Sequence, residues 1–325
     1  LISMSNKSNN QGRAYEFICL LSLYEAIKQI RNANIIENSS YEAAHKAWNT
    51  LKPSEQALYT LSAKSTIDTI FSLEPNIIEE DEDILNLFIQ TDKHGENADV
   101  RDIIIERKDI RWEIGLSIKH NHTAVKHSRL SASLDFGEKW YGVKCSQNYW
   151  EATKPVYNFL KEKKKTGILF EELNAKEETV YVPLLKAFIN EVSTQIKQNS
   201  SIPRKMVEYL LSKYDFYKVI SIDKKRITTI QSFNMYGTLN QASKVKEPDI
   251  RVPLINLPSE LLHIGFKPNH KNTVIMCFDN GWQFSFRVHN AEKHVTPSLK
   301  FDIQIEGMPV DINIKFNCTW KNENN

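Results

Sequence analysis

Residues 112–119 read Trp-Glu-Ile-Gly-Leu-Ser-Ile-Lys, and in this stretch apolar side chains alternate strictly with polar or small ones. A period of two is typical of a β-strand that buries one face. The face predicted to lie in the core carries Trp112, Ile114, Leu116 and Ile118. Ser117 and Lys119, two positions apart, project from the opposite face. The sequence therefore predicts a buried strand that ends in a lysine on its polar face.

A second extended segment lies just before this strand. The β-branched run Ile103–Ile105 is joined to it by the polar residues 107–109, which predicts a β-hairpin or two neighbouring strands. Asp99 and Asp102 precede or open the run, where a carboxylate can project from a fixed strand end. The polar face of the following strand is then predicted to point at the site that Asp102 lines.

Periodicity divides the rest of the chain into a helical part and a β-rich part. Helical spacing of apolar residues predicts helices over residues 13–30, 41–51, 53–75, 123–134, 147–164, 182–196 and 203–213. Strand patterns span residues 217–222, 226–233, 273–278, 282–288, 299–305 and 310–316, with Asp279-Asn280-Gly281 as a hairpin turn. The acidic run 79–83 is interpreted as a solvated helix start.

The composition is that of an ordinary folded protein, with 325 residues of which 41% are hydrophobic and 25% charged. No apolar run approaches the roughly 20 residues that span a bilayer, and the amino end lacks a secretory pattern. We therefore expect a cytoplasmic protein with no membrane partner. The formal net charge of +2 neither requires nor excludes a polyanionic partner. The four cysteines are scattered, which predicts reduced thiols.

The acids and the strand-end lysine together suggest one kind of site. Cleavage of a phosphodiester needs a divalent metal held by carboxylates, with a cation beside the reacting phosphate. Asp102 and Lys119 fit these two roles, and Asp99 is a further oxygen donor. A lone lysine at a solvated strand end is a common structural feature, so the spacing by itself leaves both interpretations open.

The run that follows the lysine favours contact with nucleic acid. Its candidate DNA-binding residues are His120, Asn121, His122, Lys126, His127 and Arg129. On the predicted helix, Lys126 and Arg129 share a face, and helix amino ends suit phosphate oxygens. A His-Asn-His metal nuclease is not indicated, because its three residues are spread over a hairpin and a helix, whereas these are contiguous.

Several motifs along the chain together resemble one known family. An acid at one strand and Ser-x-Lys at the next resembles a variant of the PD-(D/E)xK nuclease superfamily. Residues 5–16 (Ser-Asn-Lys-Ser-Asn-Asn-Gln-Gly-Arg-Ala-Tyr-Glu), 99–103, 112–122 and 124–131 (Ala-Val-Lys-His-Ser-Arg-Leu-Ser) resemble the HaeIII restriction endonuclease family. Further similar stretches are residues 205–211, 233–240, 285–291 and 298–302. The resemblance extends from about Met4 to the end of the chain.

This resemblance implies a bacterial type II restriction endonuclease that cleaves double-stranded DNA at GGCC with Mg²⁺. It implies an α+β fold, with a mixed central sheet flanked by helices in an α/β nuclease core, a helical amino-terminal part and a β-rich carboxy-terminal DNA-recognition part. We expect a flexible tail over residues 1–11, a helical and nuclease core over 12–214 with catalytic strands near 99–119, and the β-rich region over 215–325.

The resemblance also implies partners. A cognate DNA methyltransferase would belong to the same restriction-modification system, as a functional and not a physical partner. A palindromic target would suit a homodimer, although a monomer that acts twice can also cut a short site.

The resemblance assigns roles in the catalytic site, with one departure from the superfamily pattern. Asp102 would be the first acid and Lys119 the lysine, but Ser117 stands where a metal-binding acid is expected, and it would serve as a hydrogen-bonding group. Glu16 is the preferred second carboxylate, because a glutamate in the opening helix is a frequent extra acid in this superfamily. Glu113 shares the strand face but is roughly 20 Å from Lys119 at strand rise. The remaining alternatives are Asp135 and Glu138.

Readout of G·C pairs needs donors for guanine and acceptors or amides for the partner bases. The candidates in the β-rich part are Arg287, His289, Asn290 and Lys300, with Arg226, Asn234 and Asn240 as a second set. The alternative function is a catalytically inactive, sequence-specific DNA-binding protein of the same fold. The partner methyltransferase itself is disfavoured, since the chain has no glycine-rich loop after an early strand and no Pro-Cys nucleophile.

Overall fold

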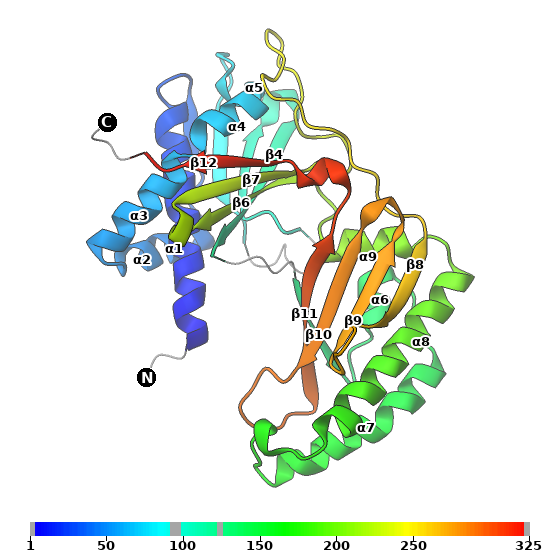
Figure 1. Cartoon of the computed structure of the whole chain (residues 1–325). Helices are drawn as coiled ribbons and strands as arrows, with labels where there is room; N and C mark the ends of the chain where they lie inside the picture. The colour runs from blue at the N-terminus through cyan, green and yellow to red at the C-terminus, as the bar shows by residue number, and fades with distance from the viewer. Residues whose placement is uncertain (1–3, 92–98, 122–125, 322–325) are drawn as a thin grey trace. The chain divides into compact units, whose positions relative to one another are not determined.

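The structure, a computed structural model, describes residues 4–91, 99–121 and 126–321, without the side chains of residues 4–9, 126, 127, 311 and 313 (Figure 1). Its helices are α1 Met4–Ile27, α2 Ser39–Asn49, α3 Pro53–Lys64, α4 Ile67–Leu73, α5 Pro75–Ile78, α6 Phe136–Tyr141, α7 Gln147–Lys165, α8 Val182–Gln198 and α9 Ile202–Leu210. Its strands are β1 Ala33–Ile35, β2 Leu85–Ile89, β3 Ile103–Arg107, β4 Trp112–His120, β5 Lys126–Ser131, β6 Phe216–Ile222, β7 Ile227–Phe233, β8 Leu261–Phe266, β9 Thr273–Phe278, β10 Gln283–His289, β11 Ser298–Gly307 and β12 Lys315–Thr319. The predicted α+β class is confirmed. Among the described helices, none combines the length and the apolar character needed to cross a membrane.

The chain folds as two compact units that alternate along the sequence. The first unit takes residues 1–123, 212–255 and 310–325, and the second takes residues 124–211 and 256–309. This division differs from the predicted single boundary near residue 215, because strands distant in sequence pair with one another within each unit. The predicted tail over residues 1–11 also differs from the structure, in which α1 already begins at Met4.

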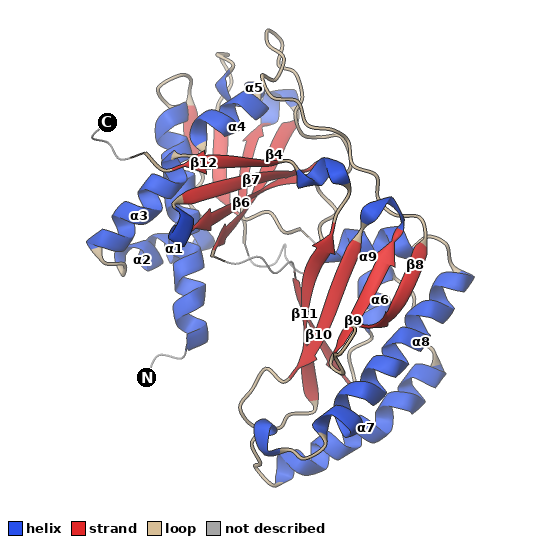
Figure 2. Ribbon diagram, viewed as in Figure 1, coloured by secondary structure: helices blue, strands red, loops and turns tan. Residues whose placement is uncertain are grey.

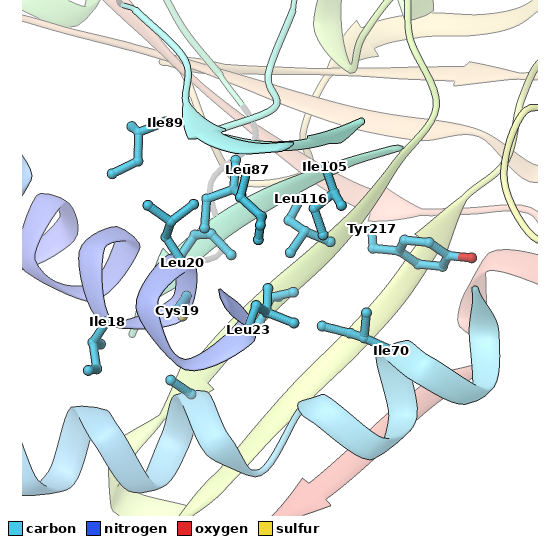
Figure 3. Packing of buried hydrophobic residues seen from close by; sticks show 14 of the residues in the cluster. Ile18, Cys19, Leu20, Leu23, Ile70, Leu87, Ile89, Ile105, Leu116 and Tyr217 are labelled. Atoms are coloured by element: carbon cyan, nitrogen blue, oxygen red, sulfur yellow. The ribbon is translucent and has the colours of Figure 1, made fainter. Parts of the chain in front are cut away.

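The first unit is built on a seven-stranded mixed sheet in the order β1-β2-β3-β4-β6-β7-β12. β3 and β4 pair antiparallel, as the hairpin prediction requires, whereas β4 and β6 pair parallel. On one face α1 supplies Leu20 and Leu23, which pack among the sheet residues Leu87, Ile105 and Leu116 (Figure 3). This apolar contact fixes the strand register, because a shift by one residue would turn Leu116 away from the core.

The opposite face of the same sheet is polar. Residues that pair in adjacent strands project from the same face. Ser117 of β4 pairs with Lys218 of β6, which pairs with Gln231 of β7 and then with Lys315 of β12. Lys119 lies on this face as well, two residues after Ser117. The predicted division of the 112–119 strand into an apolar and a polar face is therefore confirmed.

The acidic run 79–83 is not a solvated helix start, and that interpretation was wrong. Three of its carboxylates surround the fully buried Arg107, at 2.7 Å for Glu79, 3.0 Å for Asp81 and 2.8 Å for Asp83. Arg31, also buried, forms a second ion pair with Asp83. The run is held inward because a buried guanidinium needs carboxylate partners.

Glu74 is a fully buried carboxyl group beside the sheet. Its Oε1 accepts hydrogen bonds from the Tyr217 hydroxyl at 2.6 Å and from the backbone N–H of Asn240 at 2.5 Å. Its Oε2 is buried without a hydrogen-bond partner among the described residues. Burial outweighs these bonds and raises the pKa of Glu74 from 4.5 to about 7.

Because this folded-state pKa is raised, the folded protein binds more protons than the unfolded chain between pH 4.5 and about 7. We therefore expect the free energy of unfolding to fall as the pH rises through this window, and Glu74→Gln to flatten that dependence. Urea denaturation at several pH values measures it. Glu162→Gln, at an exposed position, is the control and should retain the wild-type slope. An identical slope in both variants would contradict the assignment to Glu74.

The second unit is a five-stranded antiparallel sheet in the order β5-β11-β10-β9-β8, with helices against one face (Figure 2). Trp140 of α6 and Phe188 of α8 pack on Phe286 of β10 and Phe301 of β11. The predicted hairpin turn is confirmed, since residues 279–281 join β9 to β10 with positive φ at Asn280 and Gly281.

The helix predicted over residues 123–134 is wrong. Residues 126–131 form β5, an edge strand that pairs antiparallel with β11. Ser128 and Leu130 are buried and Arg129 is exposed, which is the alternation of a strand. Without a helix, the shared helical face predicted for Lys126 and Arg129 does not form.

Candidate active site

Asp102 and Lys119 form the centre of the candidate site. The amide of Asp102 donates to the carbonyl of Leu116 at 2.8 Å, which fixes the start of β3 against β4. One carboxylate oxygen of Asp102, Oδ2, then accepts from the Lys119 Nζ at 3.0 Å and from the Ile118 amide at 2.6 Å. The Ser117 hydroxyl is 3.5 Å from the same oxygen. The predicted Asp102, Ser117 and Lys119 are thus brought together.

Lys119 is held in its charged form. Burial disfavours the ammonium, but the charges of Asp102 and Glu16 outweigh burial, so the pKa of Lys119 is raised above its ordinary value. At neutral pH the side chain is therefore a hydrogen-bond donor and a positive charge, and it does not act as a base. Glu16 of α1 therefore lies close enough to Lys119 for its negative charge to raise the pKa of the lysine.

Asp99 and Glu113 are engaged elsewhere. Both carboxylate oxygens of Asp99 accept from the Arg101 guanidinium, at 2.9 and 2.8 Å, and Arg101 also reaches Glu113 at 2.8 Å. Burial alone would raise the pKa of Asp99, but these hydrogen bonds and Gln90 hold it below its ordinary value. The Arg101 side chain crosses directly over Gly115, where any Cβ would overlap it.

His120 and Asn121 do not begin a helix. The His120 ring lies between Asp223, at 2.8 Å from Nε2, and the Tyr59 hydroxyl, at 3.3 Å from Nδ1. Asn121, with a positive φ, donates to the same Asp223 carboxylate at 3.0 Å. These contacts close the turn after β4. His122 lies outside the described residues, and so do the side chains of Lys126 and His127.

The chain as a whole can be compared with known proteins. Residues 12–309 match the HaeIII restriction endonuclease family. The chain belongs to this family. It is 53% identical over 310 residues, which are 95% of this chain and 97% of the relative, to the type II restriction enzyme HaeIII of Haemophilus aegyptius. No solved structure matches the chain significantly.

Membership of the HaeIII restriction endonuclease family confirms the predicted resemblance and activity. The protein is a type II site-specific deoxyribonuclease, its substrate is DNA, and the family implies a divalent metal cofactor. Among the described residues no group of three or more His, Cys, Asp or Glu side chains could hold a metal. Asp102 and Glu16 nevertheless fit such an ion, because Mg²⁺-type sites commonly use one or two carboxylates completed by phosphate oxygens and water.

The outer face of the second unit's sheet brings together four of the predicted DNA-contact residues from distant parts of the sequence. Arg129 of β5 pairs with Lys300 of β11, which pairs with His289 of β10, so the three form one row. In the next row, Arg287 donates to Asp302 at 3.0 Å with 55% of its side chain exposed. This face carries polar side chains because the helices cover the other one.

The remaining candidates have structural contacts. Asn290 donates to the carbonyls of Glu292 and His294 and so holds the loop after β10. Asp135 caps α6 by accepting from the Glu138 amide. In the second set, Asn234 accepts from the Leu239 amide, Asn240 donates to two carbonyls, and Arg226 packs on the Trp320 ring.

Three residues beside the site were missed in the sequence. Arg101 pairs with Asp99 and Glu113, Asp223 holds His120, and Lys218 lies next to Ser117 on the neighbouring strand. Lys218 had a visible signal, because it interrupts the otherwise apolar run 216–220. Asp223 and Arg101 had no comparable signal, since Asp223 binds His120 of a different strand and Arg101 binds Glu113 across the hairpin.

Proposed function

We propose that this enzyme hydrolyses phosphodiester bonds of double-stranded DNA at GGCC with Mg²⁺ as its cofactor. The observation that carries this proposal is the ion pair between Asp102, just before β3, and Lys119 of β4. The charge of Glu16 helps to raise the pKa of the same lysine. The GGCC target is the one that the family resemblance implies. A cognate methyltransferase that protects host sites and a homodimer that matches the palindrome belong to the same proposal.

Each residue of the site has a proposed task. Asp102 and Glu16 hold the metal, and Ser117 and the Ile118 amide orient Asp102 by hydrogen bonding to it. The ion, when bound, supplies Lewis-acid stabilisation and an acidified water. Lys119 keeps its proton and donates to the phosphate or to the attacking water. Asp99 and Glu113, bound by Arg101, support the strand end and do not bind metal.

The outer face of the second unit is the proposed recognition surface. Arg129, Lys300 and His289 suit phosphate oxygens, because two cationic side chains and an imidazole form one row on one sheet face. Arg287 is the best candidate to donate hydrogen bonds to guanine O6 and N7, because its side chain is exposed and Asp302 orients its guanidinium group. We propose that Asn290 stabilises the loop after β10 and does not contact DNA.

One digestion experiment tests both the function and the second carboxylate. Wild-type protein and Mg²⁺ should cut a DNA of known sequence into discrete fragments whose ends map inside GGCC. Glu16→Gln should raise the Mg²⁺ concentration for half-maximal cleavage by roughly tenfold or more, in line with losses on altering metal-site groups. Glu113→Gln is the matched control and should leave that concentration unchanged.

Two outcomes would count against this assignment. A salt-sensitive gel shift without any cleavage would favour the inactive DNA-binding alternative. A larger effect of Glu113→Gln than of Glu16→Gln would indicate that the metal binds near Arg101 and not near α1.

A further inference from the structure

Gln304 is a half-buried residue of β11 on the outer face of the second unit's sheet. The residues that alternate with it, Phe301 and Ile303, are fully buried on the face that the helices cover. Asp302 lies two residues before Gln304 on the same outer face, and it pairs across the strands with Arg287 of β10 (Figure 2). Three polar side chains therefore lie together on the proposed recognition surface.

The carboxylate of Asp302 binds both of its polar neighbours. Its Oδ2 accepts a hydrogen bond from the Arg287 guanidinium at 3.0 Å, and its Oδ1 accepts one from Nε2 of Gln304 at 3.2 Å. Only 18% of the Asp302 side chain is exposed, against 55% for Arg287, so the carboxylate is the covered partner. The two oxygens of one rigid group thus fix the direction of a guanidinium and of an amide relative to each other.

The contact with Asp302 also decides which atom Gln304 presents to a ligand. A carboxylate accepts hydrogen bonds and does not donate them, so the amide nitrogen of Gln304 must face Asp302. The carbonyl oxygen, Oε1, then points away from Asp302. Gln304 therefore presents an acceptor, while Arg287 has further N–H donors besides the one that Asp302 accepts.

This combination of donors and an acceptor matches the major-groove edge of a G·C base pair. Guanine presents two acceptors, O6 and N7, and the cytosine beside it presents a donor, the N4 amino group. Arginine donors on guanine and a glutamine oxygen on cytosine satisfy all three groups. An A·T pair presents the adenine N6 amino group beside N7, so the guanidinium would place a donor against a donor.

We propose that Gln304 contacts the cytosine and Arg287 the guanine of one G·C pair in the target, with Asp302 as the positioning residue that both share. This inference rests on the proposed recognition surface, and it adds Gln304 as a specificity-determining residue. Because a single carboxylate holds both side chains, the two contacts belong to the same base pair and not to separate pairs.

The test uses GGCC duplexes in which one chemical group of one base is missing. Either a cytosine is replaced by an analogue without the N4 amino group, or a guanine by 7-deazaguanine, which lacks N7. Each replacement is made separately in the outer and in the inner G·C pairs of the palindrome. The penalty is the ratio of kcat/KM for cleavage of the unmodified duplex to that of the modified one, with Mg²⁺. As a ratio within one preparation, it does not depend on the fraction of folded protein.

In one of the two kinds of pair, the wild-type enzyme should show a penalty of roughly 3- to 10-fold for each missing group, the size of one hydrogen bond. Gln304→Leu should remove the cytosine penalty there and keep the guanine penalty, and Arg287→Met should do the reverse. Asp302→Ala should reduce both penalties together. Gln147→Leu is the matched control, because this exposed amide also donates to a carboxylate, that of Glu151 at 3.1 Å, but lies on α7. It should keep both penalties.

The outcomes separate this inference from the proposed function. A wild-type enzyme that is insensitive to the missing amino group, or a Gln304→Leu variant that keeps the cytosine penalty, overturns the inference while GGCC cleavage itself stands. Penalties that Gln304→Leu and Arg287→Met remove in different base pairs, or an Asp302→Ala variant that keeps both, overturn the shared contact. If the wild-type protein does not cleave GGCC, the proposed function fails and this inference fails with it.

Discussion

Lys119→Ala is expected to lower the single-turnover rate of GGCC cleavage by roughly 10²- to 10³-fold, the loss seen when one preorganised transition-state donor is removed. The physical reason is the fixed position of its ammonium group. Asp102 holds it at 3.0 Å, and its raised pKa keeps it protonated at the pH of the reaction. The alanine variant keeps the strand but loses the donor. The rate is measured on a duplex that carries one site, with enzyme in excess.

The controls for this variant separate chemistry from folding and binding. Lys108→Ala removes a lysine from the turn between β3 and β4, where 67% of the side chain is exposed, and should cut at the wild-type rate. Lys119→Ala should still retard the duplex in a gel when the metal is chelated. Wild-type cleavage by Lys119→Ala with normal binding would show that the candidate site is misassigned.

Arg107→Met is expected to lower the free energy of unfolding by about 3–5 kcal/mol, the usual cost of removing one partner of a buried ion pair. The variant fills a similar volume but leaves Glu79 and Asp83 as buried carboxylates without the guanidinium that both of them bind. Chemical denaturation at neutral pH measures the loss. Lys244→Met is the matched control, because Lys244 pairs with Asp81 of the same cluster from an exposed position. Exposed ion pairs contribute little, so this control should unfold like the wild type.

The loss of unfolding free energy in Arg107→Met should depend on pH, because the partners of Arg107 are carboxylates. Burial opposes ionisation of Glu79, but Arg107 outweighs it, and the pKa of both Glu79 and Asp83 lies below its ordinary value in the folded protein. Carboxylates with lowered pKa stabilise the fold above their unfolded-state pKa, and this stabilisation is lost as the pH falls through the folded-state values. The difference between wild type and Arg107→Met should therefore shrink in acid. A constant difference from pH 7 down to the acid transition would argue against this origin.

The local pattern around the catalytic lysine could be predicted from the sequence. Strict alternation identified β4 and its two faces, and the β-branched run identified β3, because both signals come from residues next to each other in the chain. The position of Asp102 opposite Ser117 and Lys119 followed from the hairpin. Glu16 was chosen through the family resemblance, and the structure places it near Lys119.

Other features depend on contacts between distant segments, which periodicity does not contain. The pattern in residues 126–131 fits a helix as well as a strand, and pairing with β11 decides for the strand. An acidic run is solvated unless a buried arginine binds it, and Arg107 is on a different strand. Lys218 was visible as an interruption of an apolar run, but only the β4–β6 register relates it to Lys119.

The alternation of the two units along the chain has a consequence for synthesis of the enzyme in a living cell. Asp102 and Lys119 leave the ribosome early, but β6, which borders β4 in the sheet, comes only after most of the second unit has been made. A truncated or nascent chain that stops before β6 lacks that neighbour and presents β4 as an open edge. We therefore expect a fragment that ends before β6 to cut DNA poorly, because β4, the strand that carries Lys119, then has no neighbour on that side.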